Sequence, residues 1–366
     1  GGVVVFAGRL ATPRAPGHAA APMPRRVTLK DVAAKAGVTA STVCRALNMD
    51  PRVSLATRKR IKKIATELGY RPDPLLSALA RQRRGHLTES DIKTIAYITN
   101  FPTQDEWRQH TFYGPLFRGA QIQATRNGYK LEHFWLGAPG MTPARLGDIL
   151  FNRGIAAVCI APTPAVRSHL EFPWERFSCA TIGYSLQTPD LHRTAPHHFH
   201  GIVTATRRLH ELGYRRIGLS FFVGSSRRVD DLWLAGAYLA DKNHPELTLK
   251  VLLFENDTLA EAARWARDER LDIILSDNLD VLRQLRAHDV RIPGDIGYAT
   301  LNWTPAEPEI AGINQRPGDV GAAATDLIIA QIRRGERGVP RLPRTTLVEC
   351  DWVNGASARK LNLSRI

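Results

Sequence analysis

Two stretches of this 366-residue chain hold side chains whose types and spacing could do chemistry. The first, GVTASTVCRAL (37–47), brings Ser41, Cys44 and Arg45 close together. A hydroxyl and a guanidinium can hydrogen-bond to the edges of nucleic-acid bases, whereas the thiol could be a reactive group or a packing group. The second, HRTAPHHFH (192–200), holds four histidines. No cysteine or carboxylate set lies nearby in the sequence, so we expect these histidines to be solvated and to hold no metal.

The charge of the chain is concentrated at its N-terminal end. Residues 1–90 hold 17 Lys and Arg against 5 Asp and Glu, whereas residues 91–366 hold 33 against 30. A basic module joined to a nearly neutral remainder indicates a polyanionic partner, with a solvated basic surface as the alternative. No apolar run approaches the roughly 18 residues of a membrane span, so we expect none. The four cysteines lack metal-binding spacing and are read as reduced thiols of a cytosolic protein.

Helical signals surround the first stretch. Thr28 has the position of an N-cap for a helix over 29–36, and a glycine-containing turn leads to a second helix over 40–47. Two short helices joined by such a turn form a helix-turn-helix pattern. Ser54 has the position of the cap of a third helix over about 55–68, whose basic residues are expected on its exposed face.

From residue 91 onwards, apolar strand runs alternate with helices. Repeated βα units predict parallel sheets with helices on both faces, and two such halves would leave a cleft at the carboxyl ends of the strands. The expected strands cover 94–99, 130–136, 156–162, 179–184, 216–221, 250–255, 271–276, 296–302 and 345–353. The expected helices cover 114–129, 144–154, 201–214, 230–242 and 259–269.

The stretch VTLKDVAAKAGVTASTVCRALN…VSLATRKRIKKIATELGYRPD (27–73) resembles the DNA-binding headpiece of the LacI/GalR family of bacterial transcription regulators. Three later stretches, ELGYRRIGL (211–219), RIPGDIGYATLN (291–302) and AGINQRPGDVGAAATDLI (311–328), are similar to the regulatory domain of that family. The resemblance implies an all-α helix-turn-helix headpiece followed by an α/β two-lobed domain of the periplasmic-binding-protein type.

The resemblance also implies which headpiece residues contact DNA. Ala40, Ser41 and Arg45 match positions that meet base edges in the major groove, where Arg45 can offer a bidentate fork to guanine. Thr28, Thr42 and Asn48 match positions that hold phosphates. Leu79 matches a leucine that enters the minor groove from a hinge helix. Cys44 stands where the family most often has Ser, and we expect it either to pack or to mark a lost phosphate contact, without redox chemistry. The expected DNA-contacting residues are Thr28, Leu29, Ala40, Ser41, Thr42, Arg45, Asn48, Leu79 and Arg81.

Candidate effector residues lie in the second part of the chain. Asn100, Trp107 and Phe112 follow the first expected strand, while Trp233, Asp277 and Asn302 match or replace ligand-holding positions of the family. Aromatic rings and amides suit a sugar or another neutral, flat-faced ligand. Packing between lobes or at a dimer interface is the alternative for each residue.

The expected domain organisation follows from these assignments. Residues 1–22 are expected to be a disordered extension, with Met23 as a candidate natural start. The other expected segments are a DNA-binding domain (23–71), a hinge helix and linker (72–90), an effector domain (91–358) and a tail (359–366). The expected N-terminal lobe covers 92–188 and 313–342, and the expected C-terminal lobe covers 190–311 and 345–358.

The leading hypothesis is a cytoplasmic, nucleoid-associated transcription regulator, a repressor by the common mode of the family. It would be a homodimer, because two hinge helices must lie side by side on a pseudo-palindromic double-stranded DNA operator. A small-molecule effector, a carbohydrate or derivative, would control operator affinity in either direction. A solute-binding protein without DNA function and an enzyme are the alternatives. No nucleophile elbow, phosphate loop or zinc motif stands out, so we expect no enzyme, no cofactor and no metal.

Overall fold

A computed structural model describes residues 28–47, 53–68, 70, 93–255 and 261–361. The chain divides into two compact units, residues 1–87 and 88–366. The expected extension over 1–22 and the expected hinge over 72–90 lie outside the described residues. Among the residues that the structure describes, no helix combines the length and the apolar character that crossing a membrane requires.

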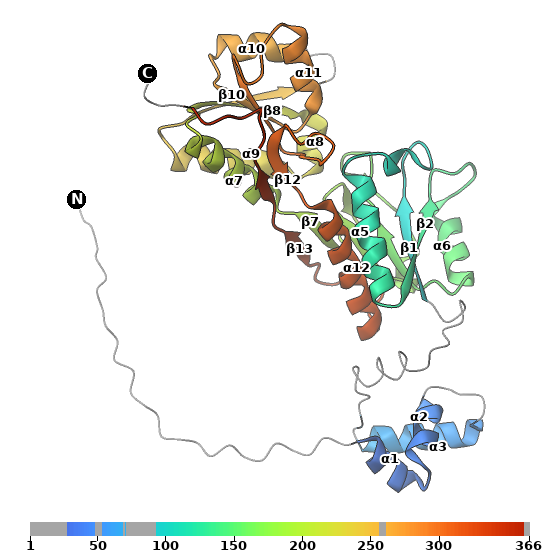
Figure 1. The fold of residues 1–366 in the computed structure, drawn as a ribbon. Helices are drawn as coiled ribbons and strands as arrows, with labels where there is room; N and C mark the ends of the chain where they lie inside the picture. Colours follow the sequence, from blue (N-terminus) through green and yellow to red (C-terminus); the bar gives the residue numbers. More distant parts are fainter. Residues whose placement is uncertain (1–27, 48–52, 69, 71–92, 256–260, 362–366) are drawn as a thin grey trace, which may run out of the picture. The chain divides into compact units, whose positions relative to one another are not determined.

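The described part of the first unit consists of α1 (Leu29–Ala36), α2 (Ala40–Leu47) and α3 (Leu55–Glu67), as Figure 1 shows. α1 begins with a capping box, because the Thr28 side chain accepts from the Asp31 N–H while the Asp31 carboxylate accepts from the Thr28 N–H. One apolar side of each helix faces a common core, so the predicted helix-turn-helix pattern is confirmed. The buried core residues are Val32, Ala33, Ala36, Val43, Ala46, Val53, Ile61 and Ala65.

The second unit holds two six-stranded sheets in its described residues, each at the centre of one lobe (Figure 1). In the N-terminal lobe the strand order is β13–β7–β5–β3–β1–β2, and every neighbouring pair is parallel. Core residues fill both faces, with α5 (Tyr113–Arg126) and α12 (Pro317–Arg334) on one face and α6 (Pro143–Asn152) on the other. The strands are β1 (Lys93–Thr99), β2 (Tyr129–Trp135), β3 (Ala157–Ile160), β5 (Ser178–Ile182), β7 (His192–Pro196) and β13 (Thr345–Val348).

The C-terminal lobe repeats this plan with the strand order β14–β12–β11–β10–β8–β9. All its neighbouring pairs are parallel except β14 with β12. Helices cover both faces, as predicted from the βα repeats. The strands are β8 (Arg216–Phe222), β9 (Thr248–Phe254), β10 (Ile273–Ser276), β11 (Gly297–Thr300), β12 (Ala311–Asn314) and β14 (Asp351–Val353). The helices are α7 (His198–Glu211), α8 (Val223–Arg228), α9 (Leu232–Asn243), α10 (Ala262–Asp268) and α11 (Leu279–Ala287).

Short elements complete the N-terminal lobe. β4 (Ser168–His169) and β6 (Leu186–Thr188) form a small two-stranded sheet. Two 3-10 turns, η2 (Glu106–Arg108) and η3 (Trp174–Arg176), each bury a tryptophan. The turn η2 lies in the loop between β1 and α5.

The described chain passes between the lobes after Pro196, after Asn314 and after Val348. These crossings differ from the expected lobe boundaries. β7 still pairs with β5 in the first sheet, so the first crossing comes later than the expected 188–190. The run 345–353, expected as one strand, is two strands in different sheets, because β13 pairs with β7 and β14 pairs with β12.

Candidate DNA-reading helix and effector pocket

The exposed side of α2 carries the residues predicted to contact bases. Ser41 and Arg45 are exposed and lie one helical turn apart, and Ala40 is half-buried beside them. On the opposite side, Val43 and Ala46 are buried against the other two helices. α2 therefore presents a hydroxyl and a guanidinium outwards from a packed support.

Hydroxyl groups lie at the starts of both helices of the motif. Thr39 Oγ1 accepts from the Thr42 N–H at 3.2 Å and lies 2.9 Å from Thr42 Oγ1. The Thr28 hydroxyl donates to the Asp31 carboxylate at 2.7 Å, so the capping box already uses it. Leu29 is half-buried against the core. Asn48, Leu79, Arg81 and the side chain of Cys44 lie outside the described residues.

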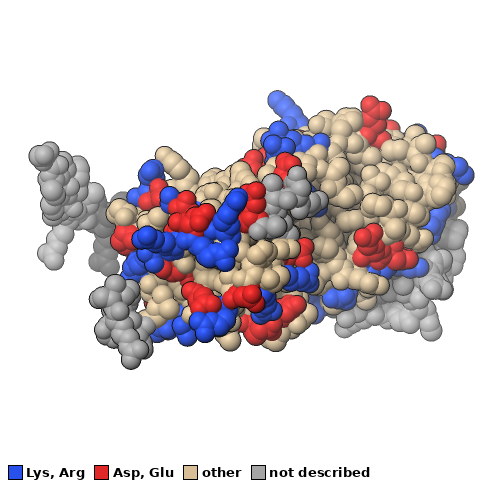
Figure 2. All heavy atoms as spheres, turned by 90° about the horizontal axis from the view of Figure 1, so that it is seen from above, with Lys and Arg blue, Asp and Glu red and all other residues tan. Residues whose placement is uncertain are grey.

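Charge is distributed differently in the two units. The exposed side of α3 carries Lys59, Arg60, Lys62 and Lys63, as predicted, and Arg60 Nη2 donates to the carbonyl of Ala36 at 3.2 Å. On the face that Figure 2 shows, Lys and Arg lie among Asp and Glu rather than in one continuous patch. The concentration of positive charge in the first unit is the electrostatic signature of a nucleic-acid partner.

A cavity of about 650 Å³ lies between the two lobes of the second unit. Its walls come from the loop before α5 and the ends of β3 and β5 on one side, and from the starts of α7, α9 and α11 on the other. It therefore lies beyond the carboxyl ends of parallel strands, where the βα pattern predicted a ligand cleft. Four of the predicted effector residues line it, namely Phe112, Trp233, Asp277 and Asn302.

Asn100 and Trp107 are not among the residues that line this cavity. Asn100 is exposed just after β1. Trp107 is buried in the core of the N-terminal lobe, and its indole Nε1 donates to the carbonyl of Gln104 at 2.8 Å. The structure thus gives Trp107 a packing position, which corrects the expectation of a ligand contact.

Asp277 presents a carboxylate to the cavity from a buried position. It is only 6% exposed, and its Oδ1 accepts from the Phe222 N–H at 3.0 Å. Its Oδ2 has no hydrogen-bond partner among the described residues. Burial raises the pKa of Asp277 to about 6, and the hydrogen bond from the Phe222 N–H opposes that rise. Such a carboxyl can accept a hydrogen bond when ionised and donate one when protonated.

The Asn302 amide is held by the protein itself. Its Nδ2 donates to the carbonyl of Asp277 at 2.5 Å, and its Oδ1 accepts from Gln315 Nε2 at 2.5 Å. Gln315 Nε2 also donates to the carbonyl of Leu301. Asn302 therefore positions the loop that carries Asp277 as well as lining the cavity.

Two further buried polar atoms at the cavity lack partners among the described residues, His198 Nδ1 and Trp303 Nε1. Burial, helped by His197, lowers the pKa of His198 to about 3, so this ring is neutral at physiological pH. Its ring meets Trp233 edge to face, with centroids 5.5 Å apart. Sequence reasoning missed both residues, although each comes shortly after a strand, β7 or β11, whose carboxyl end faces the cleft.

A hydrogen bond between described residues joins the two lobes at the cavity wall. Arg228, at the end of α8, donates through Nη2 to the hydroxyl of Tyr113, at the start of α5, at 2.6 Å. The guanidinium also lies 5.8 Å from the centroid of the tyrosine ring. Because the partners belong to different lobes, this contact depends on how far the lobes are separated.

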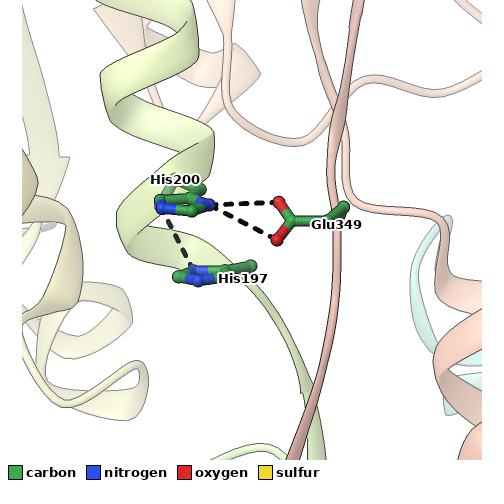
Figure 3. Close-up of side chains that lie close together, drawn as sticks. All are labelled: His197, His200 and Glu349. Carbon is green, nitrogen blue, oxygen red and sulfur yellow. Dashed lines mark hydrogen bonds and ion pairs between the residues drawn. The ribbon is translucent and has the colours of Figure 1, made fainter. Parts of the chain in front are cut away.

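The histidine-rich stretch differs from the expectation in two respects. His192 and His198 are buried rather than solvated. Chain folding also brings a carboxylate to His200, because His200 Nδ1 lies 3.3 Å from both oxygens of Glu349 (Figure 3). The His197 and His200 rings stack in parallel with centroids 3.8 Å apart, and His197 Nδ1 accepts from the His200 N–H.

A helix-turn-helix unit joined in one chain to a two-lobed α/β unit with an interlobe cavity defines a class, the ligand-responsive DNA-binding regulators. Residues 28–73 match the family described as bacterial regulatory proteins of the lacI family, and residues 206–358 match the periplasmic binding protein-like domain. The repressor CytR of Escherichia coli K12 is 35% identical over 354 residues, which cover 91% of this chain and 97% of CytR. The chain belongs to the LacI family of bacterial transcription regulators.

Other relatives agree with this assignment. The regulator CelR of Thermobifida fusca is 27% identical over 330 residues, covering 84% of this chain and 92% of CelR. Two solved structures share the fold across nearly the whole chain. A CelR–cellobiose complex has a TM-score of 0.56 at 23% identity and covers 91% of this chain and 100% of that chain. The lac repressor dimer bound to operator has a TM-score of 0.53 at 17% identity and covers 92% of this chain and 100% of that chain.

Proposed function

We propose that this regulator is a homodimeric repressor that binds a pseudo-palindromic DNA operator and releases or tightens it when a neutral, polyhydroxylated effector occupies the interlobe cavity. The effector part of the proposal rests on three buried polar atoms, on Asp277, His198 and Trp303, that have no hydrogen-bond partner among the described residues. A buried polar atom without a partner costs free energy, which a ligand that supplies the missing hydrogen bond recovers.

The chemistry of these atoms favours a carbohydrate-like ligand. An indole N–H donates only, a carboxylate accepts, and a neutral imidazole can do either through its free nitrogen. Hydroxyl groups serve all three roles, and the rings of Phe112 and Trp233 give apolar faces on which a sugar ring can stack. The solved complex of the relative CelR with cellobiose supports the same ligand class.

A thermal-shift screen of the full chain with sugars and sugar acids tests the effector proposal. We expect a binding sugar to raise the melting temperature by mass action, and we expect Asp277→Ala and Trp233→Phe to reduce that shift. Asn100→Ala is the matched control, because Asn100 lies outside the cavity and should leave the shift unchanged. An equal loss in Asn100→Ala and Asp277→Ala, or no shift with any sugar, would contradict the proposal.

For DNA, we propose base contacts by Ala40, Ser41 and Arg45 from α2. We further propose phosphate contacts by Thr42, by Asn48 and by Thr28, whose hydroxyl would exchange the Asp31 carboxylate for a phosphate oxygen. Support comes from the exposed side of α2 and from the basic exposed side of α3. The proposed minor-groove contact by Leu79, with Arg81 on a phosphate, completes the operator interface. This work would take place in the cytoplasm, at the nucleoid, without catalysis.

A further inference from the structure

His210, His244 and Glu246 form a group of side chains that could ligate a metal in the C-terminal lobe, away from the effector cavity. His210 Nε2 lies 3.5 Å from Glu246 Oε1, and His244 Nδ1 lies 3.1 Å from the same oxygen. The two imidazole rings are inclined by 60°, with centroids 5.6 Å apart. The three ligand atoms all lie within 4.8 Å of one another, so one metal ion could contact all three.

Three segments of the C-terminal lobe position these side chains. His210 lies in the last turn of α7, His244 directly follows α9, and Glu246 belongs to the turn before β9. The Leu247 N–H donates to the His244 carbonyl at 2.9 Å, and the Leu247 side chain is buried in the core that α7 and α9 share. The site is partly sheltered, since the three side chains are 26%, 33% and 44% exposed.

The C-terminal ends of α7 and α9 meet at this group. The unsatisfied carbonyls at a helix C-terminus carry partial negative charge, which favours a cation there. The Glu246 carboxylate adds a full negative charge at this place. Arg215 Nη1 already donates to the carbonyl of His210 at the end of α7. The end of α9 and the Glu246 carboxylate therefore supply the negative charge that favours a positive ion between the two imidazoles.

We propose that His210, His244 and Glu246 bind a divalent transition-metal ion of the zinc type, with water at a fourth position. A tetrahedral zinc ion with bonds of about 2.1 Å separates its ligands by roughly 3.4 Å, close to the spacings on Glu246. Two imidazoles and one carboxylate suit zinc, copper or nickel and disfavour magnesium, which prefers an all-oxygen octahedral shell.

The group of His197, His200 and Glu349 lacks this geometry. Its parallel, stacked rings direct their in-plane lone pairs side by side rather than towards one ion, and His197 Nδ1 already accepts a backbone hydrogen bond. It is therefore a natural comparison within the same chain (Figure 3).

A metal at the proposed site would join the far ends of the helices that line the effector cavity. α7 begins at His198 and α9 carries Trp233 in its first turn, and both residues line the cavity. Holding the C-terminal ends of α7 and α9 together would fix the spacing of these two helices, and so the wall that they present to a ligand.

The test measures zinc bound to the tag-free full chain, stripped with a chelator and dialysed against Zn²⁺, by metal analysis and calorimetric titration. We expect His210→Gln and His244→Gln each to weaken one binding event at least tenfold, and Mg²⁺ not to compete. The double variant His197→Gln, His200→Gln is the control and should bind as the wild type does. Thermal melting without metal checks that each variant is folded.

Cobalt gives an independent readout of the same site. We expect Co²⁺ to give the visible absorption of a four-coordinate ion in the wild type, and Glu246→Gln to change that spectrum. The proposal is wrong if the folded His210→Gln and His244→Gln variants bind zinc like the wild type, or if binding is lost in the His197, His200 control instead.

Discussion

Base reading by α2 depends on few atoms. Ala40 offers a methyl group and Ser41 a short hydroxyl, so Arg45 is the long donor on the exposed side. We predict that Arg45→Ala costs about 1–3 kcal/mol at one base pair in each half-site and relaxes the base preference there. Binding to a set of operator duplexes substituted at single positions measures this effect.

Lys59→Ala on α3 is the comparison for Arg45. Lys59 is exposed on the basic side of the headpiece, so its loss should weaken binding to all duplexes alike and lower the salt dependence. If Arg45→Ala also weakened all duplexes equally, Arg45 would be a phosphate contact and the base-reading assignment would be wrong.

Asp277 makes the stability of the second unit depend on pH. The pKa of its carboxyl is raised from 3.8 to about 6 in the folded state, so the unfolded chain loses this proton at lower pH than the folded chain. The free energy of unfolding should therefore fall by at most about 3 kcal/mol as pH rises from about 4 to about 6. Above about pH 6 it should stay at the lower value. We predict that Asp277→Asn removes this slope.

Melting temperatures of the ligand-free wild type and Asp277→Asn, measured at pH 4 and pH 7, check this prediction. The variant should gain stability relative to the wild type at pH 7 and gain less or nothing at pH 4. A difference between the two proteins that is the same at both pH values would show that the ionisation of Asp277 does not contribute.

At the scale of elements, α5 and α12 pack closely in the N-terminal lobe. A Cβ atom at Gly321 would lie 2.0 Å from the carbonyl oxygen of Leu116, whereas one at Gly318 would meet its nearest neighbour at 3.9 Å. We predict that Gly321→Ala destabilises the second unit by about 1–3 kcal/mol through overpacking. Gly318→Ala, on the same helix, should be neutral or stabilising by up to about 1 kcal/mol.

Urea unfolding followed by tryptophan fluorescence measures both variants. All seven Trp lie in residues 91–366, so this signal reports on the second unit alone. Equal stability of Gly321→Ala and Gly318→Ala would contradict the close contact between α5 and α12.

Elements with strong local signals could be predicted from the sequence. Caps at Thr28 and Ser54 and the apolar spacing between them fix the three headpiece helices. Pairing partners could not be predicted in the same way, because extended backbone in 345–353 looks alike whichever sheet it joins. α12 was missed because its glycines lower helix propensity, although Gly321 lets α5 approach.

The position of the candidate cavity could be predicted from the sequence, but only some of the residues that line it could. Trp233 and Asp277 were found because they match family positions, whereas Trp107 has the same residue type and is packed in a core. His198 was missed because sequence alone does not tell a buried imidazole from a solvated one. Burial depends on which segments fold over a residue, and those segments are distant in the chain.

At the scale of the whole molecule, the bond between Arg228 and Tyr113 links the lobes. We predict that Tyr113→Phe, which removes the hydroxyl that accepts from Arg228, lowers effector affinity roughly tenfold and raises the radius of gyration of the second unit. Small-angle scattering and ligand titration measure the two effects. Tyr184→Phe changes another hydroxyl at the cavity and should leave the radius unchanged, and identical behaviour of both variants would contradict the role of this bond.

The proposed function requires that this chain recognises a DNA sequence and not DNA charge alone. Fluorescence anisotropy of the full chain with an operator duplex obtained by selection in vitro, and with a scrambled duplex, over a range of salt concentrations tests it directly. We predict that the operator binds about 10³-fold more tightly or better, and that both affinities fall steeply as salt rises. Equal affinity for the two duplexes at every salt concentration would contradict the claim.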